Sequence, residues 1–502
     1  MNASIRQFVI HALRPFHHLL HVTGFCSSVL ALSGLESLRW KIGELGVWIR
    51  FYSARSAVPA YKRLLAARPG ASGGSPRQIA DIPEMDKTSY ISVYPLEDRC
   101  TGGRLPRRGL IFDESAGSSG QATNWVRGAK ERSANIFALR LGATHRFGSA
   151  PVMYINAFAL GPWATGINLA MALSSWGRVK STGPEITKIA NTLRYFGTGH
   201  SYVILGYPPF LKQLVDSAAI AWEKYDVSMI FGGEGMTESS RRYLQARGIG
   251  NIYGSYGASD LDLNIAAETD FTIALRRLLE QRTDIANKLL RHAGASPMIF
   301  QYNPSEFFVE SNADDELLVT ICRPNYVAPK VRYNIHDKGH VMRFAELCGI
   351  LASHGIQVGE MCSRLLDLPV MFHYGRSDLS VAYYGCKIAP ADVQEAIFQV
   401  PAMADAVSNF QLQTHEDIDG DKRLTVHVEC SGQLPKCRPD DLSRSFFAAL
   451  AAVNQDFRES RRMVPAGKAP AMMLHCVGEG PFANCKDLIK RQYIDARNAA
   501  TC

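Results

Sequence analysis

The chain has 502 residues, an ordinary apolar content of 46% and a formal net charge of +8. This length allows two or more domains with a large core, and the composition is that of a soluble globular protein. The positive charge is spread thinly and no long Lys/Arg block interleaved with aromatic residues appears, so nucleic acid is not an implied partner.

The cysteines and the apolar segments indicate the expected compartment. Eleven cysteines are scattered without CxxC pairs, which is typical of buried or incidental thiols rather than of a disulfide framework. No stretch reaches the roughly 18 apolar residues of a membrane span. We therefore expect a cytoplasmic protein.

Residues 1 to about 70 have the periodicity of helices, with apolar positions every three or four residues. A further helix is predicted from Ser56, with Pro59 in its first turn. His17 and His21 are four residues apart on one predicted helix face, a spacing that metals can use. No carboxylate or third ligand follows nearby, so we interpret them as surface or hydrogen-bonded histidines.

A loop rich in glycine and small hydroxylated residues runs from Glu114 to Thr123, between two strand-like segments. Backbone N–H groups in such a loop can converge on an anion, so we interpret it as a phosphate-binding loop. Gly/Ser-rich connections are also common as plain turns, and the rest of the chain has to decide between the two interpretations.

Short apolar runs of strand length follow, separated by helical patterns. They are residues 152–155, 202–205 and 227–231. This alternation predicts an α/β layered core with parallel strands, and ligands of such a core bind at the ends of the strands.

Two glycine-containing turns follow strand-like segments in this core. Gly232 and Gly233 allow a flat ligand to approach the backbone closely, and a helix is predicted from about Thr237. Residues 253–260 then place a tyrosine-glycine turn beside the carboxylate of Asp260. A stacked base and a magnesium ion suit this combination, because Mg²⁺ takes one or two carboxylates with phosphate oxygens. Alone, the segment also fits a tight turn with a capping Asp.

The sequence pattern changes near residue 374. Before it, residues 316–321 predict a strand, and residues 331–339 predict a strand that ends in an Asp-x-Gly turn. After it, a helix and two alternating strands predict a compact α+β unit. We therefore expect one domain over residues 1–374 and a second over residues 375–502. The acidic segment 417–421 lacks the later bidentate Glu of a calcium loop, so we interpret it as a hairpin turn.

With these segments in order, the chain resembles the adenylate-forming superfamily of acyl- and aryl-CoA ligases and peptide-synthetase adenylation domains. Its closer resemblance is to the phenylacetate–CoA ligase branch and its capsule-biosynthesis-like relatives. Residues 58–61 and 82–87 resemble that branch's N-terminal pattern, and residues 115–123 resemble the superfamily's phosphate loop, Ser-Ser-Gly-Thr-Thr-Gly-Lys-Pro-Thr. The resemblance implies a large α/β AMP-binding domain, a small mobile α+β C-terminal domain, and ATP-dependent formation of an acyl-adenylate.

The resemblance also assigns roles to residues of this chain. Asp260 stands where the superfamily usually has Glu as its magnesium ligand, and Asp337 matches the acid that binds the ribose hydroxyls. The other assignments are Ser118, Ser119 and Gly120 at the β- and γ-phosphates, Gly232, Gly233 and Glu234 along the adenine, Tyr256 at the base or α-phosphate, Arg376 beside the ribose, Asp378 at the hinge, Gly385 in the thiol channel, and Ser115, Gly117, Thr123, Gly257 and Ser259 in the wider nucleotide site.

The chain departs from the superfamily pattern at two places. Gln121 and Ala122 replace Lys-Pro in the phosphate loop, so a positive charge expected near the triphosphate is missing. Either magnesium or Arg127 compensates, or the ATP affinity is lower. The catalytic lysine of the C-terminal domain belongs in a Gly-Lys element, which this chain lacks in that form. Lys486 is the better candidate, and Lys490 is the alternative.

The sequence says little about which carboxylic acid is activated. Phe158, Trp163 and Gly166 lie where relatives build their acyl pocket, and they would line an apolar cavity or belong to the core. The absence of a Gly-x-Ser-x-Gly elbow and of a His-Glu-x-x-His pair argues against a hydrolase. We expect a small-molecule carboxylic acid to be activated with ATP and Mg²⁺ and passed to a thiol, with coenzyme A as the leading acceptor. A carrier-protein phosphopantetheine thiol, an amine, and a non-catalytic nucleotide-binding module are the alternatives.

Overall fold

The computed structural model describes residues 3–28, 33–67, 76–115, 123–148, 151–217, 219–291, 297–376, 381–388, 390–404, 406–430, 438–465 and 467–483. Helices cover the N-terminal part, as predicted, and Pro59 lies in the first turn of its helix. The residue before Pro59 is extended, so it ends one helix while the proline begins the next. These helices are α1 (Ala3–Val22), α2 (Phe25–Ser28), α3 (Glu36–Ala57) and α4 (Pro59–Ala66).

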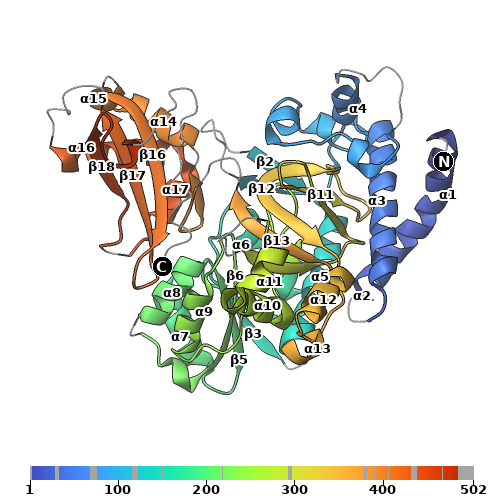
Figure 1. Cartoon of the computed structure of the whole chain (residues 1–502), viewed down its shortest axis with the longest axis horizontal. Coiled ribbons are helices and arrows are strands. Elements are labelled where there is room, and N and C mark those ends of the chain that lie inside the picture. Colours follow the sequence, from blue (N-terminus) through green and yellow to red (C-terminus); the bar gives the residue numbers. More distant parts are fainter. Residues whose placement is uncertain are drawn as a thin grey trace.

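A large mixed sheet forms the centre of the described structure (Figure 1). Its eleven strands have the order β10-β11-β12-β13-β9-β8-β7-β6-β5-β3-β4. The strands of its parallel half are β3 (Val152–Asn156), β4 (Arg178–Ser181), β5 (Ser201–Gly206), β6 (Asp226–Gly232) and β7 (Ile252–Tyr256). The antiparallel half contains β8 (Ala266–Ala267), β9 (Met298–Tyr302), β10 (Phe307–Ser311), β11 (Glu316–Ile321), β12 (Tyr333–Met342) and β13 (Val370–Arg376).

The three apolar runs read from the sequence are confirmed as the parallel strands β3, β5 and β6. They are continuously apolar because both faces of this half are covered by helices. Tyr154 and Val203 face the cluster that contains α5 and α6, whereas Met153 and Ile204 face the cluster that contains α7, α8 and α9. Neighbouring residues of a strand point to opposite faces, so each run supplies both cores.

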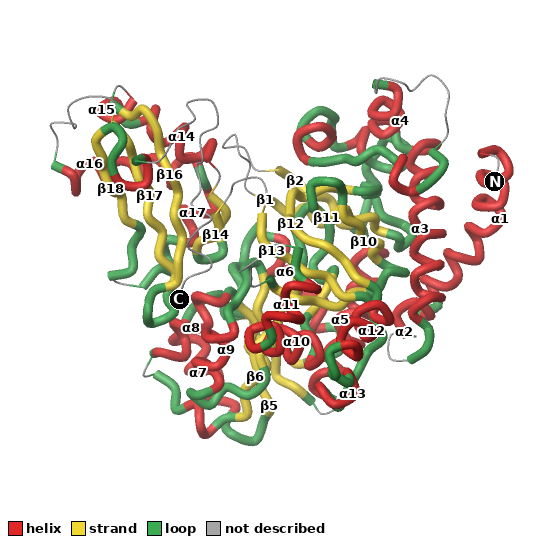
Figure 2. Tube along the Cα trace, viewed as in Figure 1, coloured by secondary structure: helices red, strands yellow, loops and turns green. Residues whose placement is uncertain are grey.

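The helices of this layered part are packed around the sheet, as the tube view shows (Figure 2). They are α5 (Ala129–Phe147), α6 (Ala164–Ser174), α7 (Ile186–Phe196), α8 (Pro208–Asp216), α9 (Glu238–Gln245), α10 (Asp270–Gln281), α11 (Thr283–Leu289), α12 (Phe344–Ser353) and α13 (Val358–Met361). The helix predicted from Thr237 is confirmed as α9, with the Thr237 side chain accepting a hydrogen bond from the N–H of Ser240.

The prediction that a strand ends in a turn at Asp337 is wrong. Strand β12 continues to Met342 and only changes register between Lys338 and Gly339. Gly339 allows this continuation, because a side chain there would collide with Leu317 and with the backbone of Phe372. The sequence showed a turn-like triplet, but the pairing with β13 on one side and β11 on the other keeps the chain extended.

The described residues after 380 form an α+β arrangement with a core of its own. The predicted helix and the two predicted strands are confirmed as α14, β16 and β17. The elements are β14 (Val381–Tyr383), β15 (Cys386–Ile388), α14 (Pro390–Gln399), α15 (Pro401–Ala404), β16 (Val407–Glu416), β17 (Lys422–Cys430), α16 (Pro439–Val453), α17 (Gln455–Ser460) and β18 (Ala471–Cys476). The domain boundary near residue 374 stays a prediction, and β13 still belongs to the large sheet up to Arg376.

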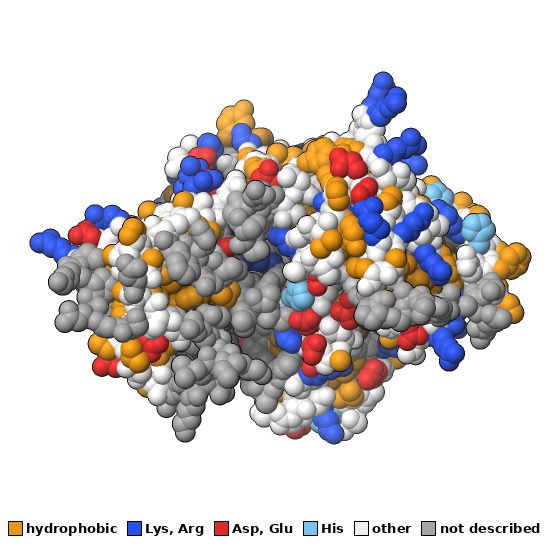
Figure 3. Space-filling model, turned by 90° about the horizontal axis from the view of Figure 1, so that it is seen from above, with side chains coloured by type: hydrophobic (Ala, Val, Ile, Leu, Met, Phe, Trp, Pro, Cys, Tyr) orange, Lys and Arg blue, Asp and Glu red, His pale blue; other side chains and the backbone are white. Residues whose placement is uncertain are grey.

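Within the described ranges, no helix is long and apolar enough to cross a membrane, and every cysteine is free. On the face seen from above, basic side chains are interspersed with acidic and apolar ones rather than gathered in one patch (Figure 3).

Candidate active site

A cavity of about 830 Å³ opens at the carboxyl ends of the parallel strands. Its wall combines the end of β1 (Ile111–Ser115), the loop after β3, the glycines after β6, the turn after β7, and residues of β12. Described residues from the C-terminal part close one side of it. Sequence reasoning placed a ligand site at these strand ends, and the loops that carry the predicted residues meet there.

The predicted phosphate loop connects β1 to β2 (Thr123–Arg127), which pair as an antiparallel hairpin from Ser115 opposite Thr123. Ser115 lines the cavity, and its hydroxyl accepts a hydrogen bond of 2.8 Å from the indole N–H of Trp125. The base of the loop is thereby fixed at the cavity. The predicted phosphate ligands Ser118, Ser119 and Gly120 lie outside the described residues, as do Gly117 and Gln121.

Asp260 lies on the cavity wall together with Gly257 and Ser259. The hydroxyl of Tyr333 donates a 2.8 Å hydrogen bond to Asp260 Oδ2, so one carboxylate oxygen is held. Within the described residues the other oxygen has no partner, which fits a ligand for a hard cation such as Mg²⁺. Gly257 must be glycine here, because a side chain would collide with the carbonyl of Leu263.

Arg127 holds the turn that carries Asp260. Its guanidinium donates hydrogen bonds to the carbonyls of Ser259 and Leu261, and it forms an ion pair of 3.1 Å with Asp113. The side chain is buried, and these contacts occupy it. In the described structure Arg127 therefore orients the turn that carries Asp260 instead of replacing the lysine that the phosphate loop lacks.

Two lysines near this end of the cavity were not assigned a role from the sequence. Lys87 lines the cavity beside the base of the phosphate loop. Lys330 is buried behind Asp260, with its ammonium 4.8 Å from the ring centre of Trp125 and 5.1 Å from that of Tyr333. Burial, and to a smaller extent the charge of Arg99, lower the pKa of Lys330 to about 7. Neither position has a local sequence pattern that reveals its distance from Asp260.

Tyr256 and Asp337 meet away from the cavity surface. The Tyr256 hydroxyl donates a 2.6 Å hydrogen bond to Asp337 Oδ2, and His373 Nε2 lies 3.2 Å from the same oxygen. Both residues are buried, and the cavity wall at this point consists of Ser255 and His336. Arg376 is the strand partner of Asp337. The structure thus brings the predicted base and ribose residues together, and their contact with a nucleotide stays a prediction.

Gly232 and Gly233 line the cavity, whereas Glu234 makes contacts with the C-terminal part. The Glu234 carboxylate accepts a hydrogen bond from the N–H of Gly385 and pairs with Lys422. This carboxylate is fully buried, so the contact is screened from solvent. Glu234 therefore links the two parts of the chain in this structure, and its position along the adenine stays a prediction.

The apolar part of the cavity contains two of the three predicted acyl-pocket residues. Phe158 and Trp163 line it, while Gly166 packs tightly against the carbonyl of Ala159 and allows α6 to approach that segment. Phe158 is buried and also lines the cavity, and its contact with an acyl group stays a prediction. The other apolar lining residues include Leu139, Ala143, Tyr154, Leu169, Leu173, Leu205 and Ile230.

The predicted thiol-channel glycine, Gly385, lies on the cavity wall. The further lining residues from this part of the chain are Tyr384, Lys387, Pro390, Asp392, Asp456, Glu459, Ser460 and Met463. Lys486, Lys490 and the predicted hinge residue Asp378 lie outside the described residues.

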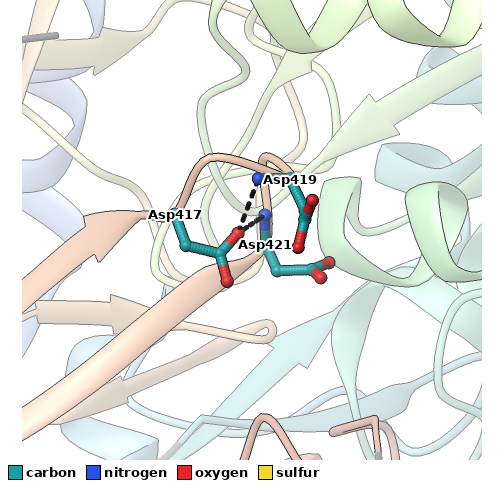
Figure 4. A group of neighbouring side chains, drawn as sticks. All are labelled: Asp417, Asp419 and Asp421. Atoms are coloured by element: carbon teal, nitrogen blue, oxygen red, sulfur yellow. Dashed lines mark hydrogen bonds between the residues drawn. The ribbon is translucent and has the colours of Figure 1, made fainter.

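The acidic segment 417–421 is a hairpin turn between β16 and β17, as predicted. Asp417 accepts backbone hydrogen bonds from Asp419 and Asp421, which brings the three carboxylates together (Figure 4). The ammonium of Lys468 lies 2.7, 3.3 and 3.0 Å from the carboxylates of Asp417, Asp419 and Asp421. Arg423 pairs with Asp417 and Lys212 with Asp421, so three basic side chains in all offset the charge of this cluster and give it a structural explanation.

The histidine pair of α1 is hydrogen-bonded, in agreement with one of the two interpretations made from sequence. His21 Nε2 lies 3.3 Å from His17 Nε2, and His17 is buried. Burial lowers the pKa of His17 to about 2 and that of His21 to about 3. No third metal ligand lies close enough to join the pair within the described residues.

No protein-family model matches the sequence, and a search of curated proteins finds no match. Solved structures do match. The structure of 2-hydroxyisobutyryl-CoA ligase with 2-HIB-AMP and CoA in the thioesterification state superposes with a TM-score of 0.63 at 12% identity, over 93% of this chain and 90% of that chain.

The same ligase in its postadenylation state gives a TM-score of 0.51 with 2-HIB-AMP, at 13% identity over 92% of this chain and 89% of that chain. With R3-HIB-AMP it also gives 0.51, at 12% identity over 93% and 90%. At these identities the likeness shows the fold. The chain has the α/β fold of this acid–CoA ligase, including its C-terminal part, which confirms the fold class predicted from the sequence.

Proposed function

We propose that the chain is an ATP-dependent carboxylate-activating ligase: an acid and ATP give an acyl-adenylate and pyrophosphate, and the acyl group then passes to a thiol. The observation that carries this proposal is the cavity itself, in which Ser115 and Asp260 line one region and an apolar pocket adjoins it. The fold supports it, since the likeness to an acid–CoA ligase extends over 93% of the chain.

Attack of a carboxylate on the α-phosphorus brings two anionic groups together, so the site has to supply positive potential at the phosphates. Asp260 would hold Mg²⁺, and this ion would neutralise charge on the phosphate oxygens. Tyr333 and Arg127 fix the position of Asp260, and Lys87 lines the same cavity. Lys87 would offset the lysine that is missing at Gln121.

We propose coenzyme A as the thiol that accepts the acyl group. The likeness supports this, because the matched acid–CoA ligase structure holds 2-HIB-AMP and CoA in the thioesterification state. Gly385 on the cavity wall fits a channel for a thin phosphopantetheine arm. A carrier-protein thiol or an amine is the alternative acceptor. The assignment to the phenylacetate–CoA ligase branch, the two-domain division and a cytoplasmic location complete the proposal.

The first test is pyrophosphate exchange into ATP across a panel of aryl, alkyl and amino acids. We expect exchange with at least one class of acid, and a loss of about 10²- to 10³-fold in Asp260→Ala, because a ligand of the phosphate-neutralising ion is removed. Asp284→Ala, at an exposed position on α11, is the matched control for loss of one carboxylate. Nucleotide binding without exchange for any acid would favour the non-catalytic module.

The second test separates the two half-reactions. We expect Lys486→Ala to abolish exchange while thioester formation from synthetic acyl-adenylate and coenzyme A continues. If Lys486→Ala retains exchange and Lys490→Ala loses it, the role belongs to Lys490. Exchange by the wild-type protein without any CoA-thioester product would point to a carrier protein or an amine as acceptor.

A further inference from the structure

One basic side chain lies in the apolar part of the cavity. On α5, Leu139, Gly142, Ala143 and Arg146 recur at intervals of three and four residues, and all four line the cavity. One face of the helix therefore borders the pocket, apolar along its length and cationic at its last turn. A charge in such surroundings is unfavourable unless neighbouring groups or a ligand compensate it.

The described contacts of Arg146 do not include an ion pair. Its Nη1 donates to the carbonyl of Gly142 at 3.2 Å and its Nη2 to the carbonyl of Glu268 at 2.7 Å, while its Nε has no hydrogen-bond partner. Two neutral carbonyls satisfy only part of a guanidinium with five N–H groups. Arg146 thus keeps hydrogen-bonding capacity and a full charge at the cavity wall.

The acidic side chains closest to Arg146 have other partners. Asp270 accepts a 2.7 Å hydrogen bond from Tyr253, whose ring centre lies 5.3 Å from the Arg146 guanidinium. The Glu268 carboxylate is bound by Arg241 at 2.7 Å and by Arg276 at 3.0 Å. The charge of Arg146 is therefore available to a ligand in the cavity.

Gly142 provides the space that the guanidinium occupies. A Cβ at this position would lie 3.1 Å from Nη1 of Arg146. Glycine is one of the poorest residues for the interior of a helix, so its presence one turn before Arg146 has a local cost. Close approach of the guanidinium to the helix backbone gives a physical reason for that glycine.

Arg146 lies at the end of the pocket remote from the turn that carries Asp260. It contacts Tyr253 on β7, whereas the turn carrying Asp260 begins after Tyr256 at the end of the same strand. Three residues of strand span about 10 Å. An acid whose carboxylate reacts near Asp260 would therefore extend along apolar side chains and end near Arg146.

We infer that the activated substrate is a dicarboxylic acid with an apolar middle, whose distal carboxylate pairs with Arg146. This inference rests on the proposed function, since the other carboxylate is the one that is adenylated. Arg146 is then a specificity-determining residue: its planar guanidinium binds a carboxylate through charge-assisted hydrogen bonds, and the distal group undergoes no covalent change.

The test compares dicarboxylic acids of graded length with their monomethyl esters, which keep the length and remove one charge. Pyrophosphate exchange gives kcat/KM for each, and titration calorimetry without ATP gives binding. We expect the wild-type protein to favour the best dicarboxylic acid over its monoester by about 10- to 100-fold, the range expected for a hydrogen bond to a charged group. Arg146→Gln should lose this preference, and Arg146→Lys should restore part of it.

Arg140→Gln is the matched control, because Arg140 is exposed on the same helix and does not line the cavity. It should keep the preference. If Arg146→Gln lowers kcat/KM equally for acid and monoester, Arg146 only stabilises the last turn of α5 and the inference is overturned. Exchange with monocarboxylic acids alone overturns the inference but supports the ligase. Absence of exchange with every acid rejects the proposed ligase activity. Calorimetry then tests the pairing of a carboxylate with Arg146 by itself. Dicarboxylate binding that is lost in Arg146→Gln supports this pairing, and unchanged or absent binding overturns it.

Discussion

Replacement of Gly385 by alanine should separate the two half-reactions. Gly385 has a φ of 82° and lies on the cavity wall at the contact between the two parts of the chain. A Cβ there would be 3.2 Å from three ring atoms of Tyr207, which packs edge-on against Phe158 at a ring distance of 4.9 Å. The ring also lies near Gly233, where an added Cβ would be 2.8 Å from it.

The expected loss in the rate of acyl transfer follows from these contacts. A residue with a Cβ in the left-handed region costs about 1 to 2 kcal/mol. The added carbon must also displace the Tyr207 ring or the segment that carries Gly385, by a few tenths of an ångström. Because a misplacement of about 1 Å can cost about 10²-fold in rate, we expect transfer to the thiol to slow by about 10- to 100-fold. Pyrophosphate exchange should persist, since the residues proposed for adenylation are unchanged.

The assay follows pyrophosphate exchange and, separately, thioester formation from synthetic acyl-adenylate and coenzyme A. Gly467→Ala is the control for backbone strain, because Gly467 has a φ of 78° and no atom would approach its Cβ within 4 Å. Both variants should lose similar stability, and only Gly385→Ala should slow the transfer. Equal loss of both half-reactions, or an unchanged transfer rate, would refute the assignment of Gly385 to the thiol channel.

Two further predictions concern pH. Burial raises the pKa of Glu131 to about 7, so the folded state binds more protons than the unfolded state between about pH 4.5 and 7 and stability falls as the pH rises through this window. In Glu131→Gln, the free energy of unfolding measured with urea should lack this decrease of about 1.4 kcal/mol per pH unit. An unchanged slope would contradict the raised pKa of Glu131. His17 and His21 stay neutral when folded, so stability should fall below pH 6.5 as the unfolded chain takes up protons. His17→Leu should make that acid-side slope shallower, and a slope equal to that of the wild type would show that His17 is protonated in the folded state.

The sequence by itself determined the local elements. Runs such as residues 202–205 became strands because they are apolar on both faces, and Pro59 and Thr237 mark helix starts through effects of their own backbone or side chain. The order of motifs also predicted the fold class, which the structural likeness confirms. These features depend on neighbours within a few residues, which a sequence displays directly.

Tertiary structure decided which side chains share the site. Lys330 lies 70 residues from Asp260 in the sequence, and Arg146 approaches Tyr253 only because α5 packs across the sheet. Glu234 follows two glycines that line the cavity, yet its carboxylate binds the C-terminal part through Lys422. Charge, burial and distance between remote residues arise from packing, so no local pattern could show that the pocket ends in an arginine.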